Sequence, residues 1–268
     1  MATPRPIALR TSDGIALTGL HWDVGLRDLG CVTAHGFTGS SRAPEVQAIC
    51  RELAARGIGV LAVDLRGHGG SGGHSTLGAD EVLDVDAAVR WLRGQGYGRV
   101  AALGWSMGGS AVLRYAGLFG GADAVVSVSS PGRWYERGTR PMRIVQWLCE
   151  TRTGRVGLRL LRRTRVSPKG WVDVPESPQE VVGDVAPTPL LIVHGDADHY
   201  FPLAHVELLR AAAPRAVVWI EAGMGHAETA TTPELTARIA RWLREVTLRE
   251  VAGAPRIPAD VCDDERHD

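Results

Sequence analysis

The chain has 268 residues, 44% of them hydrophobic and 22% charged, which is the usual composition of a folded domain. Its 30 basic and 30 acidic side chains cancel, so net charge gives no reason to expect nucleic acid or an anionic membrane as a partner. The N-terminus lacks the apolar stretch of a signal peptide, and no run of about 18 apolar residues occurs, so we expect no membrane span and a cytoplasmic location. The cysteines form no CxxC pair, which fits a reduced compartment and disfavours a metal site or a disulfide framework. They are Cys31, Cys50, Cys149 and Cys262.

Strand and helix patterns alternate along most of the chain. Residues 7–22 alternate apolar and polar side chains around a turn at Asp13 and Gly14, which predicts two short strands. Continuous apolar runs then predict strands buried on both faces at 29–36, 57–65, 98–105, 122–130, 189–196 and 215–222. Helical patterns fall at 43–56, 79–93, 107–119, 203–213 and 233–248. We therefore predict an α/β fold with a mostly parallel eight-stranded sheet flanked by helices.

One interval interrupts this alternation. Residues 132–185 hold no convincing core strand, but they include the amphipathic segment RPMRIVQWLCETRTGRVGLRLLRR. Pro141 suits the first turn of a helix, and Gly154 is a plausible break. We predict a helical cap at 132–185, inserted into a core formed by residues 1–131 and 186–250. The charged residues 251–268 are predicted to be a disordered tail.

The segment LGWSMGGSAV places Ser106 between an apolar strand and a helix. A serine at such a junction projects its hydroxyl above the sheet, and the G-x-S-x-G spacing is needed because side chains at Gly104 and Gly108 would collide with the turn. Strand before and helix after raise the weight of a pentapeptide that also occurs by chance. Ser106 is therefore a candidate nucleophile.

A serine nucleophile requires a base oriented by a carboxylate, and in such a sheet the chain order is serine, acid, histidine. His226 alone follows a late strand and precedes the final helix. The loop after the preceding strand offers Asp196 and Asp198, and their spacing does not decide between them. Three other histidines are given structural places on a strand end, a helix and the tail: His194, His205 and His267.

A developing oxyanion needs donors that are already in place. Met107 follows the nucleophile at a helix N-terminus, so its N–H is one candidate. The glycine-rich loop TAHGFTGSS follows an early strand, and we take Phe37 as the second candidate.

Five stretches resemble, in chain order, motifs of the α/β-hydrolase superfamily, in its monoacylglycerol-lipase and serine-aminopeptidase branch. They are HGFTGSS, DLRGHGGSGG, GWSMGG, LLIVHGDADHYFP and GMGHAE. The resemblance implies that Asp198 is the acid and Asp196 a turn residue, with no metal or organic cofactor. It also implies packing roles for Asp64, Arg66 and His68. Asp84 and Asp86 are expected on a solvated helix face.

The predicted cap carries both aromatic and basic residues. Candidate pocket residues are Trp105, Trp134, Trp147, Trp171 and Tyr200. For the three tryptophans of the cap, at 134, 147 and 171, we favour packing of the cap onto the core over contact with a substrate. Residues 133–170 carry 11 Arg or Lys and 2 acidic side chains, which could attract an anionic substrate. We favour a solvated basic face, because 29 arginines against one lysine indicate a compositional bias.

The resulting hypothesis is a carboxylic ester hydrolase for small or medium, largely apolar acyl groups, acting through a Ser-His-Asp triad and an acyl-enzyme. Its partner is a small-molecule ester. Two alternatives stay open: an acyltransferase or thioesterase acting on a carrier-bound or anionic acyl substrate, and a non-catalytic ligand-binding protein of the same fold. The sequence does not indicate the oligomeric state.

Overall fold

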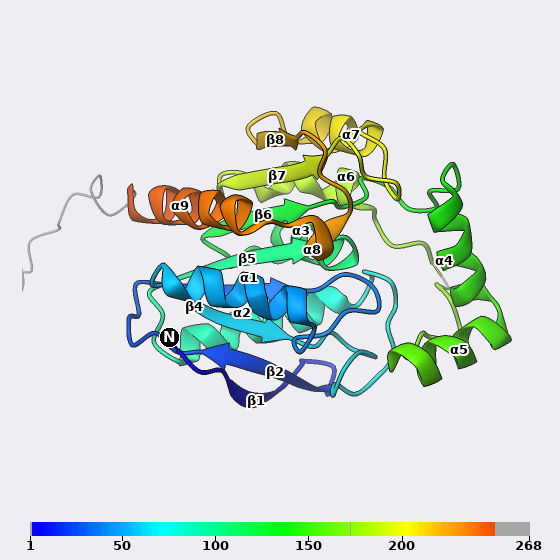
Figure 1. Cartoon of the computed structure of the whole chain (residues 1–268), viewed down its shortest axis with the longest axis horizontal. Coiled ribbons are helices and arrows are strands. Elements are labelled where there is room, and N and C mark those ends of the chain that lie inside the picture. Colours follow the sequence, from blue (N-terminus) through cyan, green and yellow to red (C-terminus); the bar gives the residue numbers. More distant parts are fainter. Residues whose placement is uncertain (1, 172, 250–268) are drawn as a thin grey trace, which may run out of the picture.

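The computed structural model describes residues 2–171 and 173–249, and it contains an eight-stranded sheet with helices on both faces (Figure 1). The spatial order of the strands is β1-β2-β4-β3-β5-β6-β7-β8. Their bounds are β1 Arg5–Arg10, β2 Ala16–Trp22, β3 Leu29–Ala34, β4 Gly59–Val63, β5 Arg99–Trp105, β6 Ala124–Val128, β7 Leu190–Gly195 and β8 Val217–Glu221. Strand β2 pairs antiparallel with both β1 and β4, and the remaining neighbours pair parallel, so the sheet is mixed and mostly parallel, as predicted.

The apolar runs form strands because both faces of the sheet are covered. Successive side chains of a strand point to opposite faces. In β3, Val32 and Ala34 enter one core cluster, whereas Leu29 and Cys31 enter the other. Helices α2 (Glu81–Gly94), α3 (Met107–Leu118) and α7 (Ala204–Ala212) cover the first face, and α1 (Pro44–Ala55) and α9 (Pro233–Arg249) cover the second.

Two further helices lie beyond the end of the sheet. Helices α4 (Arg140–Glu150) and α5 (Arg152–Arg162) stand apart from the two covering layers, in green at the right of Figure 1. The short elements that follow them are different: α6 (Pro178–Val181) and η1 (Val182–Val185) pack against α3. A third short helix, α8 (Ala227–Ala230), follows β8.

The break between α4 and α5 lies at Thr151 and not at the predicted Gly154. Thr151 has extended backbone angles, and its hydroxyl accepts the N–H of Gly154 at 3.0 Å, so it begins α5 as an N-cap. Gly154 has another reason to be glycine: a Cβ there would lie 2.5 Å from the backbone of Leu148. The glycine therefore permits close packing of the two helices.

The prediction for Asp84 is wrong. Its side chain is fully buried, and its carboxylate accepts the backbone N–H of Arg66 at 2.7 Å and pairs with the Arg66 guanidinium at 2.8 Å. A buried carboxylate needs such partners, and the helical periodicity around Asp84 does not reveal an arginine 18 residues away. Asp86 is partly exposed and pairs with Arg90.

The predicted tail at 251–268, with Cys262 and His267, lies outside the described residues. Within residues 2–171 and 173–249, no helix is long and apolar enough to cross a membrane.

Candidate active site

Ser106 occupies the turn between β5 and α3. Its backbone has a φ of 51°, in the left-handed region that residues other than glycine rarely adopt. This turn depends on two close backbone approaches, because a Cβ at Gly104 would lie 2.2 Å from the carbonyl oxygen of Gly108, and one at Gly108 would lie 2.1 Å from that of Ala34. The side chains that would collide are therefore excluded, as the motif predicts.

Three side chains from separate loops meet at this end of the sheet. The Nε2 atom of His226 lies 3.0 Å from Ser106 Oγ, and its Nδ1 atom lies 2.8 Å from Asp198 Oδ2. Because a carboxylate can only accept, Nδ1 carries the proton and Nε2 is free to accept the serine hydroxyl. The imidazole is thus placed and oriented as a general base for Ser106.

Asp198 is held as an anion by donors on its other oxygen. Its Oδ1 accepts the backbone N–H groups of Tyr200 at 2.8 Å and Phe201 at 3.1 Å. Burial acts to raise the pKa of Asp198, but the hydrogen bond from His226 and the two N–H donors outweigh burial and keep the pKa below its usual value. Asp196 instead accepts the N–H of Gly223 at 2.6 Å and stabilises the turn.

The rings around His226 restrict its orientation. Tyr200 stacks on the imidazole with ring centroids 4.3 Å apart, and Phe201 contacts it edge-on at 5.5 Å. His194 donates through Nε2 to the Phe201 carbonyl at 2.8 Å, and His205 forms a hydrogen bond with Glu136 at 3.0 Å, so both have the structural places expected of them.

The two backbone N–H groups predicted as oxyanion donors have no acceptor among the described residues. Among the hydrogen bonds of the described residues, none uses the N–H of Phe37 or of Met107. The loop that carries Phe37 lies close to the nucleophile, since a Cβ on Gly36 would be 3.3 Å from the Cβ of Ser106. Both N–H groups are therefore available to a carbonyl oxygen of a substrate attacked by Ser106.

His35 fixes the peptide that contains one of these donors. Its Nε2 accepts the N–H of Leu65 at 3.1 Å, so its Nδ1 carries the proton and donates to the Gly36 carbonyl at 2.8 Å. In a trans peptide the N–H points opposite to the carbonyl, so this bond also sets the direction of the Phe37 N–H. Sequence reasoning included His35 in a quoted motif but gave it no role.

Glu228 ends the GMGHAE motif, and nothing in the sequence indicates a role for it. It lies two residues after His226 in α8, and its Oε1 accepts the N–H of Gly36 at 2.5 Å. It therefore joins the histidine loop to the Phe37 loop. An acidic residue in the first turn of a short helix is common, so the sequence alone carried no signal for this contact.

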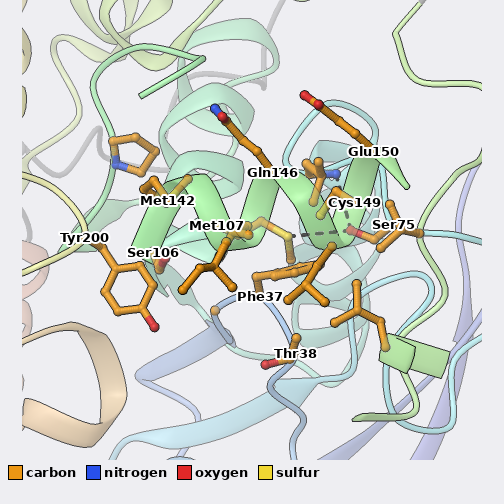
Figure 2. A pocket seen from close by; sticks show the side chains of 18 of the residues that line it. Phe37, Thr38, Ser75, Ser106, Met107, Met142, Gln146, Cys149, Glu150 and Tyr200 are labelled. Atoms are coloured by element: carbon orange, nitrogen blue, oxygen red, sulfur yellow. Dashed lines mark hydrogen bonds between the residues drawn. The ribbon is translucent and has the colours of Figure 1, made fainter. Parts of the chain in front are cut away.

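A cavity of about 990 Å³ extends from Ser106 under the two outlying helices. Figure 2 shows it between α4, which carries Met142 and Cys149, and the loop with Phe37 and Thr38. Of the predicted pocket residues, Trp134, Trp171 and Tyr200 line this cavity.

Trp105 and Trp147 do not line it, which corrects two predictions. Trp105 is fully buried in the core on the other side of β5, where its indole N–H donates to Thr231 at 3.1 Å. Trp147 is 55% exposed on the outer side of α4. Adjacency to Ser106 does not place Trp105 in the cavity, because neighbouring strand residues face opposite ways.

The loop residues of the DLRGHGGSGG stretch have packing roles. Asp64 accepts the N–H of Ser41 at 2.6 Å and of Gly70 at 3.0 Å, and Arg66 bonds Asp13 and Asp84. His68 donates through Nδ1 to the Arg66 carbonyl at 3.0 Å. No group of three or more His, Cys, Asp or Glu side chains in the described part of the chain is arranged to hold a metal ion.

Comparison with known proteins identifies a family for more than half of the chain. Residues 28–181 match the family model described as serine aminopeptidase, S33. No curated protein matches the sequence.

Solved structures share the fold at low sequence identity. The chain is similar to the Pyrococcus furiosus esterase Pf2001 at 22% identity and a TM-score of 0.71, covering 91% of both chains. It is similar to the α/β hydrolase GrgF from Penicillium sp. sh18 at 18% identity and a TM-score of 0.73, covering 93% of this chain and 99% of that one. It is also similar to a putative aryl esterase from Burkholderia cenocepacia at 18% identity and a TM-score of 0.63, covering 91% of this chain and 100% of that one. The chain therefore belongs to the serine aminopeptidase S33 family of hydrolases, within the α/β-hydrolase superfamily.

Proposed function

We propose that this hydrolase cleaves carboxylic esters of small to medium, largely apolar acyl groups through an acyl-enzyme on Ser106. The observation that carries the proposal is the single imidazole of His226, which lies within hydrogen-bond distance of both the Ser106 hydroxyl and the Asp198 carboxylate. This arrangement matches what activation of a serine nucleophile requires.

The reaction proceeds in two halves. His226 Nε2 takes the proton from Ser106 Oγ while Oγ attacks the ester carbonyl, and the same proton then passes to the departing alkoxide, which leaves as the alcohol. A water molecule next gives a proton to His226 and attacks the acyl carbon. Return of that proton to Oγ releases the carboxylic acid and restores Ser106.

Asp198 acts by staying ionised. Each half of the reaction passes through a protonated imidazole, which the adjacent carboxylate stabilises electrostatically. Its depressed pKa ensures that the negative charge is present at neutral pH, and its buried position strengthens the interaction.

The N–H groups of Phe37 and Met107 bind the oxyanion that forms when Oγ attacks. Donors fixed before the reaction cost no reorganisation. We assign this fixing to His35 and Glu228, which bond the carbonyl and the N–H of Gly36, respectively. Both residues position the loop, and neither contacts the reacting atoms in this scheme.

The lining of the cavity supports an apolar acyl group. Beyond Ser106 its wall includes the side chains of Phe37, Leu77, Leu148, Leu158 and Val166. A pocket of this volume whose lining combines apolar side chains with polar ones is typical of small-molecule sites.

The test is replacement of Ser106 by alanine, with hydrolysis of nitrophenyl acetate, butyrate and octanoate as the readout. We expect kcat/KM to fall by at least about a thousandfold. The matched control is Ser12→Ala in the exposed β1–β2 turn, which should retain full activity. Ester hydrolysis by S106A close to the wild-type rate would overturn the proposal. Cleavage of amino-acid nitroanilides in preference to all esters would keep the nucleophile and reject the substrate class.

A further inference from the structure

The α4–α5 segment, residues 139–163, exposes several large apolar side chains to solvent. Leu161 and Leu160 are 83% and 74% exposed, the highest values among the large hydrophobic residues described. Trp147, Ile144 and Val156 are each more than half exposed. Single exposed apolar residues are ordinary, but five within 18 positions mark an interaction surface.

Helix α5 separates apolar and basic residues onto different sides. Gly154 and Leu158 face the core, and Val156 and Leu160, also four residues apart, form an outward apolar row. The arginines repeat at helical spacing along the remaining side, at Arg152, Arg155, Arg159 and Arg162. The apolar stripe is thus wider than the part that the core covers.

These arginines lack carboxylate partners. Within the described residues, no Asp or Glu side chain lies within 4.0 Å of a guanidinium of the α4–α5 segment. The segment holds Arg140, Arg143, Arg152, Arg155, Arg159, Arg162 and Arg163 against a single acidic residue, Glu150. Residues 133–170 sum to +9, and the rest of the chain sums to −9. The excess of basic side chains is therefore concentrated in the stretch of chain that carries the exposed leucines.

The mouth of the cavity opens within this surface. Ile144 and Leu161 are exposed and also line the cavity, together with Arg140 and Arg162. An apolar molecule that left a lipid layer at this point would enter the cavity without crossing water.

We propose that the α4–α5 segment docks the protein on an anionic lipid bilayer, with Val156, Leu160 and Leu161 in the boundary of the acyl chains and the arginines at the headgroups. A helix with a leucine face and an arginine face is suited to this position. Anionic headgroups supply the negative charge that the arginines of this segment lack.

A second copy of the chain fits this surface less well. A two-fold contact would place the same patch on both subunits and so bring two strongly positive segments together. Like charges across an interface disfavour association.

The experiment measures co-sedimentation of the full chain with vesicles. The vesicles consist of phosphatidylcholine alone or with about 30% phosphatidylserine, at low and at high salt. The apolar variant is V156Q with L160Q, and the basic variant is R152Q with R159Q; neither pair lines the cavity. Matched controls are L118Q with F119Q at the far end of α3, and R51Q with R241Q on α1 and α9.

We expect the wild type to bind the anionic vesicles at least about tenfold more strongly than the neutral ones, and to lose this preference at high salt. The apolar variant should lose at least about tenfold in binding to both vesicle types, and the basic variant only in binding to the anionic type. The control pairs should bind as the wild type does, and all variants should hydrolyse a water-soluble ester normally. Because the readout is binding, S106A should behave as the wild type, so failure of the proposed reaction would not affect this result.

Absence of binding to anionic vesicles at low salt would overturn the proposal. Binding that survives both pairs of substitutions would overturn it as well. Dimerisation in analytical ultracentrifugation that V156Q with L160Q abolishes, without vesicle binding, would assign the surface to a second copy instead.

Discussion

The loops that carry Ser106, Asp198 and His226 and the α4–α5 segment face each other across one cavity, but different forces hold them. Hydrogen bonds to backbone groups fix the loops: His35 and Glu228 hold Gly36, and the N–H groups of Tyr200 and Phe201 hold Asp198. The α4–α5 segment packs through a small apolar cluster of Cys149, Leu158 and Val166, with partly buried neighbours. Among the hydrogen bonds of the described residues, only one joins this segment to the loop of Asp198, and its first residue, Thr139, donates it to the Tyr200 carbonyl at 3.0 Å.

The difference follows from what each region has to do. A reaction at one carbonyl requires atoms fixed to within a fraction of an ångström, which directional bonds provide. Apolar contacts are not directional, so a wall built from them can change its side chains without displacing the reacting atoms. We infer that the loops set the chemistry and that the segment sets what reaches it.

The largest difference in folding stability is expected between two glycine-to-alanine substitutions, one in each region. Gly108→Ala places a Cβ 2.1 Å from the Ala34 carbonyl oxygen, so we expect loss of more than about 3 kcal/mol of folding free energy and of all activity. Gly157→Ala in α5 meets nothing within 4 Å, and it should raise stability by about 0.5–1 kcal/mol. Urea unfolding of both variants checks the pair, and equal destabilisation would remove the contrast between the regions.

The next largest effect is a difference in kcat between substitutions of two aspartates in the same loop. Asp198→Asn removes the anion that orients His226, so kcat should fall about a thousandfold or more with little change in KM. Asp196→Asn keeps a turn acceptor for Gly223 and should cost less than about fivefold. Steady-state kinetics on a nitrophenyl ester tests both, and the reverse ranking would show that the acid is misassigned.

A smaller effect on kcat is expected from Glu228, which joins the histidine loop to the loop that carries Phe37. Glu228→Ala removes the acceptor for the Gly36 N–H, so the Phe37 donor should be less well placed and kcat should fall about tenfold. Glu228→Gln retains an acceptor oxygen and should recover most of that loss. If Glu228 only supported folding, both variants would unfold at lower urea and kcat of the folded fraction would not change.

The smallest expected effect is a gradual loss of folding stability as the pH falls. Burial, the larger cause, and the neighbouring His35 lower the pKa of His68 to about 3, and burial and Arg5 lower that of His21 to about 4. Both stay neutral in the native protein while the unfolded chain takes up protons below pH about 6.5. Stability should therefore be complete above that pH and fall toward pH 4, by up to about 1.4 kcal/mol per pH unit for each histidine.

The α4–α5 segment contains no histidine, so the acid sensitivity should belong to the core. Urea midpoints between pH 7 and pH 5 measure the slope, and His68→Gln should reduce it. An unchanged slope in that variant would mean that His68 is protonated in the native state.

The two regions also differ in how far the sequence predicts them. Strands such as β3 and β5 were predictable because a strand buried on both faces must be apolar throughout. The loops of Ser106, Asp198 and His226 were predictable because the proposed serine-hydrolase chemistry restricts their residue types and chain order.

What the sequence could not supply were contacts between distant residues. Asp84 shows a helical pattern, but its burial depends on Arg66. Glu228 is an ordinary first-turn acid until the Gly36 N–H is placed beside it. Trp147 was a candidate pocket residue only because it lies in the predicted cap, and its 55% exposure becomes evident only once α4 is packed.

The central claim is that Ser106 alone forms the covalent intermediate. It is tested by reacting the protein with a fluorophosphonate, digesting it, and locating the adduct by mass spectrometry. We predict one adduct per chain, on Ser106, at a rate that falls at least about a hundredfold in His226→Ala. An adduct on another residue, or full ester hydrolysis by protein that forms none, would contradict the account.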